Sequence, residues 1–230
     1  MLKKSILLWG GGLRGLKIYN YFRSNKTFLQ KNIKVKYIFD PSKDKLNFEN
    51  KVIFSNKKSI LNKAFKECKY FLVAIGSNFG KARYLISLEL MKKGLVPLEY
   101  IHKEAFIDKS SKIGKGIQTE PRAVIQGNCK IGDFCIINTN STIDHGSSVG
   151  NGCHIMSGAV IAGDVKIDDF VTVGANATIL PYVKIGVGAY IGAGSVVTKN
   201  VKKNEVIVGN PGRRIKYHKH KFDISMFKSK

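Results

Sequence analysis

The sequence predicts two folds in one chain: a parallel β-helix in the C-terminal half, and a small α/β domain with a parallel sheet before it. Two observations carry this prediction. An aliphatic residue returns at every sixth position from Ile107 to Val197, and only Thr119 breaks the series. Ahead of that repeat, short apolar strands alternate with helical stretches, and the first strand runs directly into three consecutive glycines, Gly10–Gly12.

The six-residue period indicates a β-helix because an α-helix repeats every 3.6 residues and a strand every two. Each hexad would form one side of a triangular coil, so a full coil has eighteen residues. A second column, four residues after each aliphatic one, holds small or slim side chains, including Cys129, Cys135 and Cys153. With Cys68, these cysteines form no CxxC pair and no metal-ligand spacing, so they are interpreted as slim apolar fillers and no metal is expected.

The first hundred residues predict a small Rossmann-like sheet with helices on both faces. The expected strands are 5–9, 35–39, 70–75 and 96–101, and the expected helices follow the glycine loop and span 58–67 and 80–93. The predicted domains are a nucleotide-sugar-binding domain, a β-helix domain and a basic C-terminal tail, at 1–104, 105–212 and 213–230.

The glycine loop between the first strand and the first helix satisfies G-x-G-x-x-G at Gly10, Gly12 and Gly15. Such a loop lets backbone amides approach a phosphate at a helix N-terminus. Asp40 ends the next strand, where a carboxylate can bind a ribose or sugar hydroxyl, and Gly76 ends the third. The pattern favours a nucleotide or nucleotide-sugar. A purely structural turn is the alternative, and NAD is not favoured because no second mononucleotide-binding half follows.

The net charge of +23 comes mostly from lysines spread along the whole chain. Solvated lysine-rich faces are the first interpretation, and an anionic ligand such as a nucleotide or coenzyme A is the second. Nucleic acid comes last, because no basic run is interleaved with aromatic residues as in a known nucleic-acid module. No apolar run is long enough to span a bilayer, so no membrane insertion and a cytoplasmic location are expected.

Three polar residues stand out in the middle coils: Asn138, His145 and His154. The period of eighteen stacks Gly163 on His145, which leaves room beside the imidazole and exposes a backbone N–H that could face an oxyanion. His154 lies half a coil from His145, so the two rings point from different sides of one prism and could meet only between subunits. This geometry predicts an oligomer. No insertion interrupts the repeat, so the N-terminal domain would have to hold an acceptor.

At this point the chain resembles the sugar O-acyltransferases of the sialic acid O-acetyltransferase type, in particular the N-acetyltransferases that act on nucleotide-linked 4-amino sugars such as UDP-bacillosamine and GDP-perosamine. The resemblance rests on the hexad repeat, the segment 138–145, the closing segment 208–212 and the glycine loop. It implies a left-handed β-helix, a homotrimer with sites between subunits, acetyl-CoA as co-substrate, and a role in bacterial surface-glycan biosynthesis.

The resemblance also implies roles for individual residues. His145 is the general base, Asn138 lines the site, and His154 lies near the thioester. The backbone at Gly163, Ala175 and Ala193 meets the pantetheine arm. The positions implied for the nucleotide-sugar are Gly12, Leu13, Arg14, Asp40, Pro41, Gly76 and Arg83. Many relatives have an acidic residue directly after the catalytic histidine, where this chain has Gly146, so Asp144 would have to replace it. Relatives also commonly have histidine where this chain has Arg14, whose guanidinium could clamp a phosphate.

The predicted mechanism is direct transfer of an acetyl group to the sugar amine. His145 removes the amine proton as the nitrogen attacks the thioester, and the Gly163 amide stabilises the oxyanion. Three alternatives stay open: O-acetylation of a sugar hydroxyl, an NAD-binding oxidoreductase, and a non-catalytic β-helix scaffold.

Overall fold

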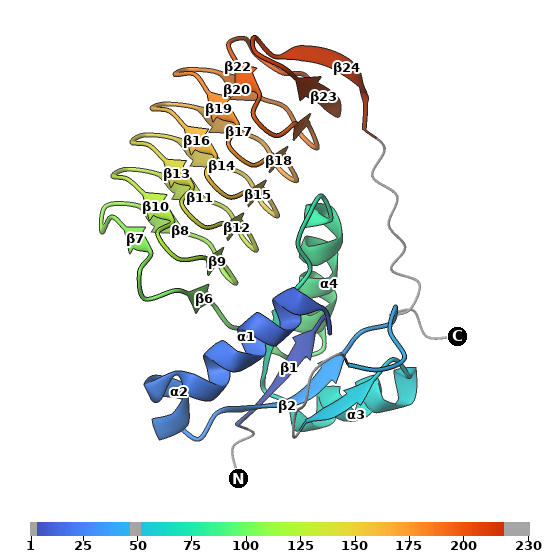
Figure 1. The fold of residues 1–230 in the computed structure, drawn as a ribbon. Coiled ribbons are helices and arrows are strands. Elements are labelled where there is room, and N and C mark those ends of the chain that lie inside the picture. Colours follow the sequence, from blue (N-terminus) through green and yellow to red (C-terminus); the bar gives the residue numbers. More distant parts are fainter. Residues whose placement is uncertain (1–3, 47–51, 219–230) are drawn as a thin grey trace. The chain divides into compact units, whose positions relative to one another are not determined.

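The computed structural model describes residues 4–46 and 52–218, which divide into two compact units. The first unit comprises the described residues up to 75 together with 85–98, and the second comprises 76–84 and 99–218. Figure 1 shows the parallel sheet of the first unit and the stacked rungs of the second. The predicted boundary at residue 104 falls inside the second unit, because strand β6 (Tyr100–Ile101) already pairs with β9 (Gln118–Thr119).

The first unit contains a sheet of five parallel strands in the order β3-β2-β1-β4-β5. The strands are β1 (Ser5–Trp9), β2 (Lys34–Phe39), β3 (Ile53–Ser55), β4 (Tyr70–Val73) and β5 (Val96–Pro97). In β1 the residues Ile6 to Trp9 are all buried, as expected of a central strand covered on both faces. The chain winds to either side of β1, and open α/β sheets bind ligands beside such a reversal.

Four helices accompany the strands: α1 (Leu13–Ser24), α2 (Lys26–Gln30), α3 (Lys58–Glu67) and α4 (Gly80–Lys92). Helix α1 buries Ile18 and Phe22, which lie four residues apart on one face. The sequence prediction is confirmed for α3 and nearly so for α4, but it missed α2 and β3. The single strand predicted at 96–101 is wrong. The Leu98 N–H bonds to Phe71 of the sheet, whereas the Tyr100 N–H bonds to Ile117 of the β-helix, so two strands replace it.

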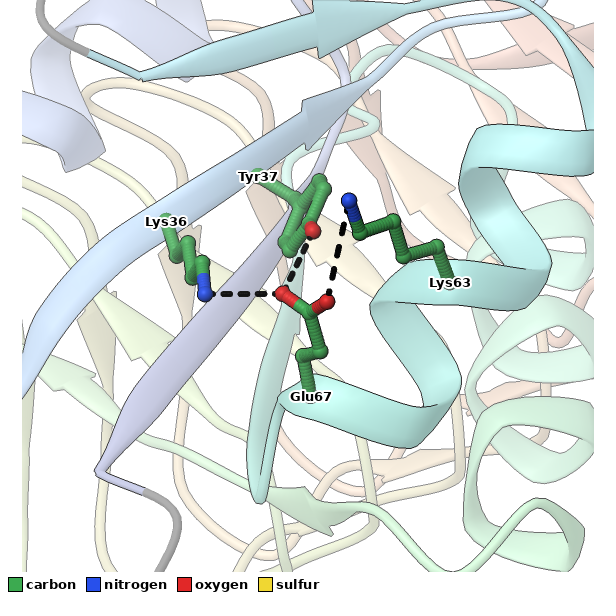
Figure 2. Close-up of polar contacts among 4 residues, drawn as sticks. All are labelled: Lys36, Tyr37, Lys63 and Glu67. Carbon is green, nitrogen blue, oxygen red and sulfur yellow. Dashed lines mark hydrogen bonds and ion pairs between the residues drawn. The ribbon is translucent and has the colours of Figure 1, made fainter.

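A charged network joins β2 to α3 (Figure 2). The Tyr37 hydroxyl donates to Glu67 Oε2 at 2.6 Å, and Lys36 Nζ lies 2.7 Å from the same oxygen. Lys63 Nζ lies 3.9 Å from Glu67 Oε1, one helical turn before it. These cations and the hydroxyl, Lys36 foremost, lower the pKa of Glu67. Burial and the neighbouring carboxylate raise the pKa of Tyr37 far above its ordinary value.

The second unit is a parallel β-helix whose three faces are three sheets of stacked short strands. The first sheet contains β7 (Phe106–Ile107), β10 (Val124–Ile125), β13 (Thr142–Ile143), β16 (Val160–Ile161), β19 (Thr178–Ile179) and β22 (Val196–Val197). The second contains β8 (Lys112–Ile113), β11 (Lys130–Ile131), β14 (Ser148–Val149), β17 (Lys166–Ile167) and β20 (Lys184–Ile185). The third contains β6, β9, β12 (Ile136–Ile137), β15 (His154–Ile155), β18 (Thr172–Val173), β21 (Tyr190–Ile191), β23 (Glu205–Val208) and β24 (Arg213–Tyr217).

The register of the β-helix confirms the coil of eighteen residues. Ile125 pairs with Ile143, and Ile143 pairs with Ile161, each exactly one coil apart. The aliphatic column forms one continuous buried core. Cys129, Cys135 and Cys153 lie within that core, which confirms their interpretation as interior fillers. Cys68 is buried as well.

The turns of the β-helix are uniform. Four residues separate each strand from the next between β7 and β22, so the predicted absence of a projecting loop is confirmed. From Gly116 to Gly194, the third residue of every such turn has a positive φ. The segment predicted as a separate basic tail begins instead with β24, which pairs antiparallel with β23. The rest of that segment, 219–230, lies outside the described residues.

Candidate functional site

The backbone geometry of the glycine loop requires glycine at two positions, Gly10 and Gly15. Gly10 has a φ of 113°, which a residue with a side chain rarely adopts. A Cβ added at Gly15 would overlap the carbonyl oxygen of Gly10, so helix α1 can begin this close to β1 only with glycine there. Gly12 is the N-cap of α1 and makes no side-chain cap. Leu13, in the first turn, is 85% exposed.

Asp40 fastens this loop to the end of β2. Its Oδ2 accepts a hydrogen bond from the Gly11 N–H at 2.8 Å, and its Oδ1 accepts from the N–H and hydroxyl of Ser42 at 3.0 and 2.7 Å. The carboxylate is 8% exposed and shapes the loop. Oδ2 has a second lone pair, so a role in binding a sugar hydroxyl stays a prediction. Pro41, next in the chain, is exposed, and Arg14 is half-buried.

Arg83 makes structural contacts that the sequence did not predict. Its side chain is fully buried in the second unit, where Nε donates to the Phe134 carbonyl at 2.7 Å. Its Nη2 donates to the carbonyls of Gly152 and Cys153 at 2.9 and 3.0 Å. A guanidinium enclosed in this way ties the start of α4 to two coils of the β-helix. These contacts give Arg83 a structural role, and its role in substrate binding stays a prediction.

Asn138 and His154 lie together on the third sheet and its following turn. Asn138 Nδ2 is 3.4 Å from His154 Nε2. His154 Nδ1 is 2.9 Å from the carbonyl oxygen of Ser77. Because a carbonyl only accepts, Nδ1 carries the proton, and Nε2 of the neutral ring is the acceptor for the Asn138 amide. His154 is 5% exposed.

Sequence reasoning missed the contact of the Ser77 carbonyl, which orients the imidazole of His154. The contact joins residues 77 positions apart, so no local pattern could reveal it. Ser77 has a φ of 52°, a conformation that serine seldom adopts. The residues on either side of Ser77 also make contacts. The Gly76 carbonyl accepts from the Phe79 N–H at 3.4 Å, and Asn78 Nδ2 lies 3.4 Å from His218 Nε2.

His145 and Gly163 are stacked as the sequence predicts. His145 is exposed at the turn between β13 and β14, and Gly163 is at the same position one coil later. A Cβ added at Gly163 would lie 2.8 Å from His145 Cε1 and 2.9 Å from Nε2, so only glycine leaves space for the ring as it stands. Within the described part of the chain, neither the imidazole nor the Gly163 N–H has a hydrogen-bond partner.

Two carboxylates belong to the turns around His145: Asp144 precedes it in the chain, and Asp164 is in the corresponding turn one coil later. Asp144 Oδ1 accepts from the backbone N–H of His145 at 2.7 Å, so this oxygen holds the backbone of the turn. Asp164 lies one coil after Gly146, and its Oδ1 fills the space in which a side chain at position 146 would begin. Gly146 also has a φ of 68°. Glycine here fits both the turn and the carboxylate above it.

The two histidines belong to different sides of the prism, as the period predicts. His145 follows β13 of the first sheet, whereas His154 is in β15 of the third. Ala175 and Ala193 form a separate stack at the turns that lead from the third sheet to the first. The Gly194 N–H donates to the Ala175 carbonyl at 2.8 Å, and Ala193 is exposed. Within one chain, Asn138 therefore lies with His154, and His145 lies with Gly163. These two pairs and the alanine stack are at separate places on the prism.

Among residues 4–46 and 52–218, no three His, Cys, Asp or Glu side chains gather closely enough to hold a metal ion. In that same part of the chain, no helix has the length and apolar character needed to cross a bilayer.

The β-helix matches the family model "Bacterial transferase hexapeptide (six repeats)" over residues 100–145 and 146–181. Among curated proteins, none matches the chain by sequence. The sequence match thus covers most of the repeat and does not include the parallel-sheet unit.

Solved structures match nearly the whole chain. The acetyltransferase domain of PglB from Neisseria gonorrhoeae, in complex with acetyl coenzyme A, is 21% identical with a TM-score of 0.78, over 93% of this chain and 100% of that one. PerB from Caulobacter crescentus, in complex with CoA and GDP-perosamine, is 23% identical with a TM-score of 0.77, over 92% and 97%. WeeI from Acinetobacter baumannii is 26% identical with a TM-score of 0.79, over 91% and 99%.

These matches confirm the expected resemblance and the two-part fold. At such identities they establish architecture, and the chemistry has to be argued from this chain's own residues. The second unit is a left-handed β-helix whose repeat matches the bacterial transferase hexapeptide model, and the first unit contains a five-stranded parallel sheet.

Proposed function

We propose that this protein is an acetyltransferase that moves the acetyl group of acetyl-CoA to the amine of a nucleotide-linked 4-amino sugar, for bacterial surface-glycan biosynthesis in the cytoplasm. The observation that carries the proposal is the exposed imidazole of His145 beside the bare, unpaired backbone N–H of Gly163. A base and an oxyanion donor side by side are what acyl transfer requires. The solved relatives with acetyl-CoA or CoA bound support the choice of acyl donor.

His145 is the general base in this proposal. Its ring makes no hydrogen bond in the described part of the chain, so Nε2 or Nδ1 is available to an incoming amine. The sugar nitrogen forms a bond to the thioester carbonyl carbon while the imidazole takes its proton. The tetrahedral intermediate then expels the coenzyme A thiolate, which the imidazolium can protonate. Asp144 holds the backbone of the turn and so fixes where the ring begins.

The Gly163 N–H is the proposed oxyanion donor. Gly163 is buried, yet its N–H donates to no group in the described residues, and an unpaired buried donor is costly unless a ligand uses it. The carbonyl oxygen of the thioester gains negative charge as the amine attacks, and a fixed N–H in a water-poor site stabilises that charge. The absence of a side chain lets the thioester approach the amide.

The acceptor would bind at the glycine loop of the parallel-sheet unit. The N-terminus of α1, with Gly12 as N-cap, favours a phosphate through the N–H groups of its first turn and its dipole. Arg14 could add a charged donor to the same phosphate. Asp40 and Pro41 follow β2 and Gly76 follows β4, and these are the two strands that pair with β1. The exposed Leu13 side chain is available to pack on a base or sugar ring.

A homotrimer would complete the site. The outward residues of the first sheet carry no charge, and Phe106 and Val160 among them are 52% and 40% exposed. His145 lies at one edge of this uncharged face, and Ala175 and Ala193 lie at the other. Packing such faces between copies would bring the alanine stack of one chain toward the His145 turn of the next. The pantetheine arm would then run between them, with Asn138 and His154 supporting the neighbouring turns.

Binding measurements test the proposal. Calorimetric titration of the full chain with acetyl-CoA should show saturable binding, and a thermal-shift panel of UDP-, GDP- and dTDP-linked 4-amino sugars should single out one nucleotide. The matching 4-hydroxy sugars separate N- from O-acetylation. Binding of NAD(H) with no response to acetyl-CoA would overturn the proposal in favour of an oxidoreductase, and no response to any of these ligands would favour a scaffold.

A further inference from the structure

The chain between β4 and the first turn of α4 is fastened to the β-helix at three places. The buried Arg83 side chain donates to three carbonyls of the β-helix. Gly80 approaches the β-helix so closely that an added Cβ would overlap the carbonyl oxygen of Gly152. The third contact joins the Ser77 carbonyl oxygen to His154 Nδ1 at 2.9 Å. The contacts on either side of Ser77 therefore hold its carbonyl in place against His154.

Ser77 has a backbone conformation that serine seldom adopts, with a φ of 52°. Such conformations persist where the surrounding structure holds them, and they are found mainly at functional sites. The Ser77 side chain gives no reason for this one, because its hydroxyl is exposed and lies 3.3 Å from Asn78 Oδ1. The Ser77 carbonyl, in contrast, contacts an imidazole that is only 5% exposed. The conformation therefore serves the direction of the carbonyl.

The hydrogen bonds that start at this carbonyl are consistent in only one arrangement. His154 Nδ1 donates to Ser77, so Nε2 of the neutral ring accepts from Asn138 Nδ2 at 3.4 Å. Asn138 Oδ1 in turn accepts from the Thr139 N–H at 2.9 Å. The reverse arrangement would place a lone pair of Nδ1 against the carbonyl oxygen and the amide N–H groups of Asn138 against another N–H. The Ser77 carbonyl thus determines, through His154, which end of the Asn138 amide faces the ring.

This arrangement leaves Asn138 with one hydrogen to give. An asparagine amide has two N–H groups on Nδ2. One of them faces His154, and the other has no partner in the part of the chain that the structure describes. Asn138 is half-buried, so a ligand can reach this hydrogen. Because Oδ1 is already bonded to Thr139, the amide is held as a donor.

The position of Asn138 along the prism matches that of the proposed base. Asn138 is in the turn between β12 and β13, and His145 is in the next turn of the same coil. The turn of Asn138 is at the corner that also carries Ala175, two coils later. In a trimer whose three-fold axis runs along the prisms, residues of one coil lie at one height. The Asn138 turn of one chain then faces the His145 turn of the next.

We propose that the backbone carbonyl of Ser77 is a positioning group of the acyl-transfer site. By fixing His154 and Asn138, it presents one Asn138 N–H to an oxygen atom of the reacting substrates. The inference rests on the proposed function, which supplies two such oxygens: the thioester carbonyl of acetyl-CoA and a hydroxyl of the acceptor sugar. A donor that is fixed before the ligand arrives needs no reorientation when it binds, which strengthens its effect.

Nitrogen-15 NMR of the ligand-free full chain tests the positioning step without any turnover. Histidine is labelled, spectra are recorded at about pH 8, above the ordinary pKa of imidazole, and the spectrum of His154→Gln identifies the His154 signals. We expect the His154 proton on Nδ1. Ser77→Gly, which adopts a positive φ freely, should keep it there. Ser77→Pro forces φ to about −65° and redirects the carbonyl, so the proton should move toward Nε2.

Gly80→Ala displaces the same segment through the Gly152 carbonyl, and it serves if Ser77→Pro does not fold. A proton on Nε2 in the wild type, or an unchanged tautomer in the displaced variants, would overturn the proposal.

Kinetics then test whether His154 acts through Asn138. His154→Phe and Asn138→Ala should each lower kcat/KM about ten-fold, as expected for one lost hydrogen bond. The double variant should be no slower than Asn138→Ala. His154→Gln, which retains one donor and one acceptor, should recover most of the loss. Additive losses, or a His154→Gln variant as slow as His154→Phe, would overturn the proposal.

Binding measurements distinguish the two candidate oxygens. If the Asn138 N–H meets the thioester carbonyl, Asn138→Ala should bind acetyl-CoA more weakly and CoA, which lacks that carbonyl, as the wild type does. If it meets the sugar hydroxyl, the KM for the sugar nucleotide should rise instead. Unchanged binding of both substrates and an unchanged rate in Asn138→Ala would overturn the proposal. A wild type that forms no product contradicts the proposed function, and the NMR result separately shows whether Ser77 positions the ring.

Discussion

The substitution Gly163→Ala perturbs the position of the proposed base and the space beside the proposed oxyanion donor. It leaves the backbone N–H of residue 163 in place and adds one methyl group 2.8 Å from His145 Cε1. Carbon atoms rest about 3.5–4.0 Å apart, so the ring must move by about 0.7–1.2 Å. His145 is exposed and its imidazole has no hydrogen-bond partner among the described residues, so this movement costs the fold little.

Displacement on this scale should be costly for catalysis. Misplacing a catalytic group by about 1 Å can reduce the rate about 10²-fold. We therefore expect Gly163→Ala to lower kcat by up to about 10²-fold, with an unchanged melting temperature. The assay is release of the coenzyme A thiol from acetyl-CoA in the presence of the sugar nucleotide that the thermal-shift panel selects.

The matched control is Gly127→Ala. Gly127 occupies the same turn position two coils before Gly163, and an added Cβ there would meet nothing closer than the Ser110 hydroxyl at 3.2 Å. Neither glycine has a positive φ, so both substitutions change the backbone equally little. If Gly163→Ala retains the kcat of Gly127→Ala, the imidazole does not act from the position described here, and the argument from the stack fails.

Three further predictions concern stability. Thr119→Val should raise the free energy of unfolding by about 1 kcal/mol in denaturant titrations, because the buried hydroxyl of Thr119 has no partner among the described residues; a lower midpoint would show that the hydroxyl is used. Arg83→Met should lower the free energy of unfolding by about 3 kcal/mol, because buried carbonyls lose their donors. A raised KM with unchanged stability would instead indicate that Arg83 binds substrate. Glu67 has a lowered pKa, so Glu67→Gln should be less stable than wild type at every pH above the ordinary pKa of 4.5. The difference in stability between the two proteins should vanish as pH falls through the lowered pKa of Glu67. A stability difference that persisted in acid would contradict the ion-pair explanation.

The β-helix was readable from sequence because its period is local and strict. Six residues set each side and eighteen set each coil, so the place of Gly163 beside His145 followed from counting. Helix α3 was readable too, since its apolar positions recur at helical spacing. Strand β3 has only three residues and α2 only five, too short for periodicity to distinguish them from a loop.

The contacts that sequence could not reveal join distant positions. Arg83 was predicted to contact the nucleotide-sugar because the resemblance implied it, but its side chain donates to three carbonyls of the β-helix. The carbonyl of Ser77 sets the tautomer of His154, and nothing in either local sequence indicates that pairing. Asp40 was placed correctly at the end of β2, yet its bonds to the loop of Gly11 and to Ser42 depend on how two strand ends meet.

The most direct test of the central claim is the rate of acetyl transfer from acetyl-CoA to the selected 4-amino sugar nucleotide, measured for wild type and His145→Ala with mass-spectrometric detection of the acetylated sugar. His145 is exposed and its ring is unbonded in the described part of the chain, so the variant should fold normally. We expect wild type to form the acetylated product and His145→Ala to be slower by about 10²–10⁴-fold. Product formation at equal rates by both proteins, or no product from wild type with any sugar of the panel, would contradict the account.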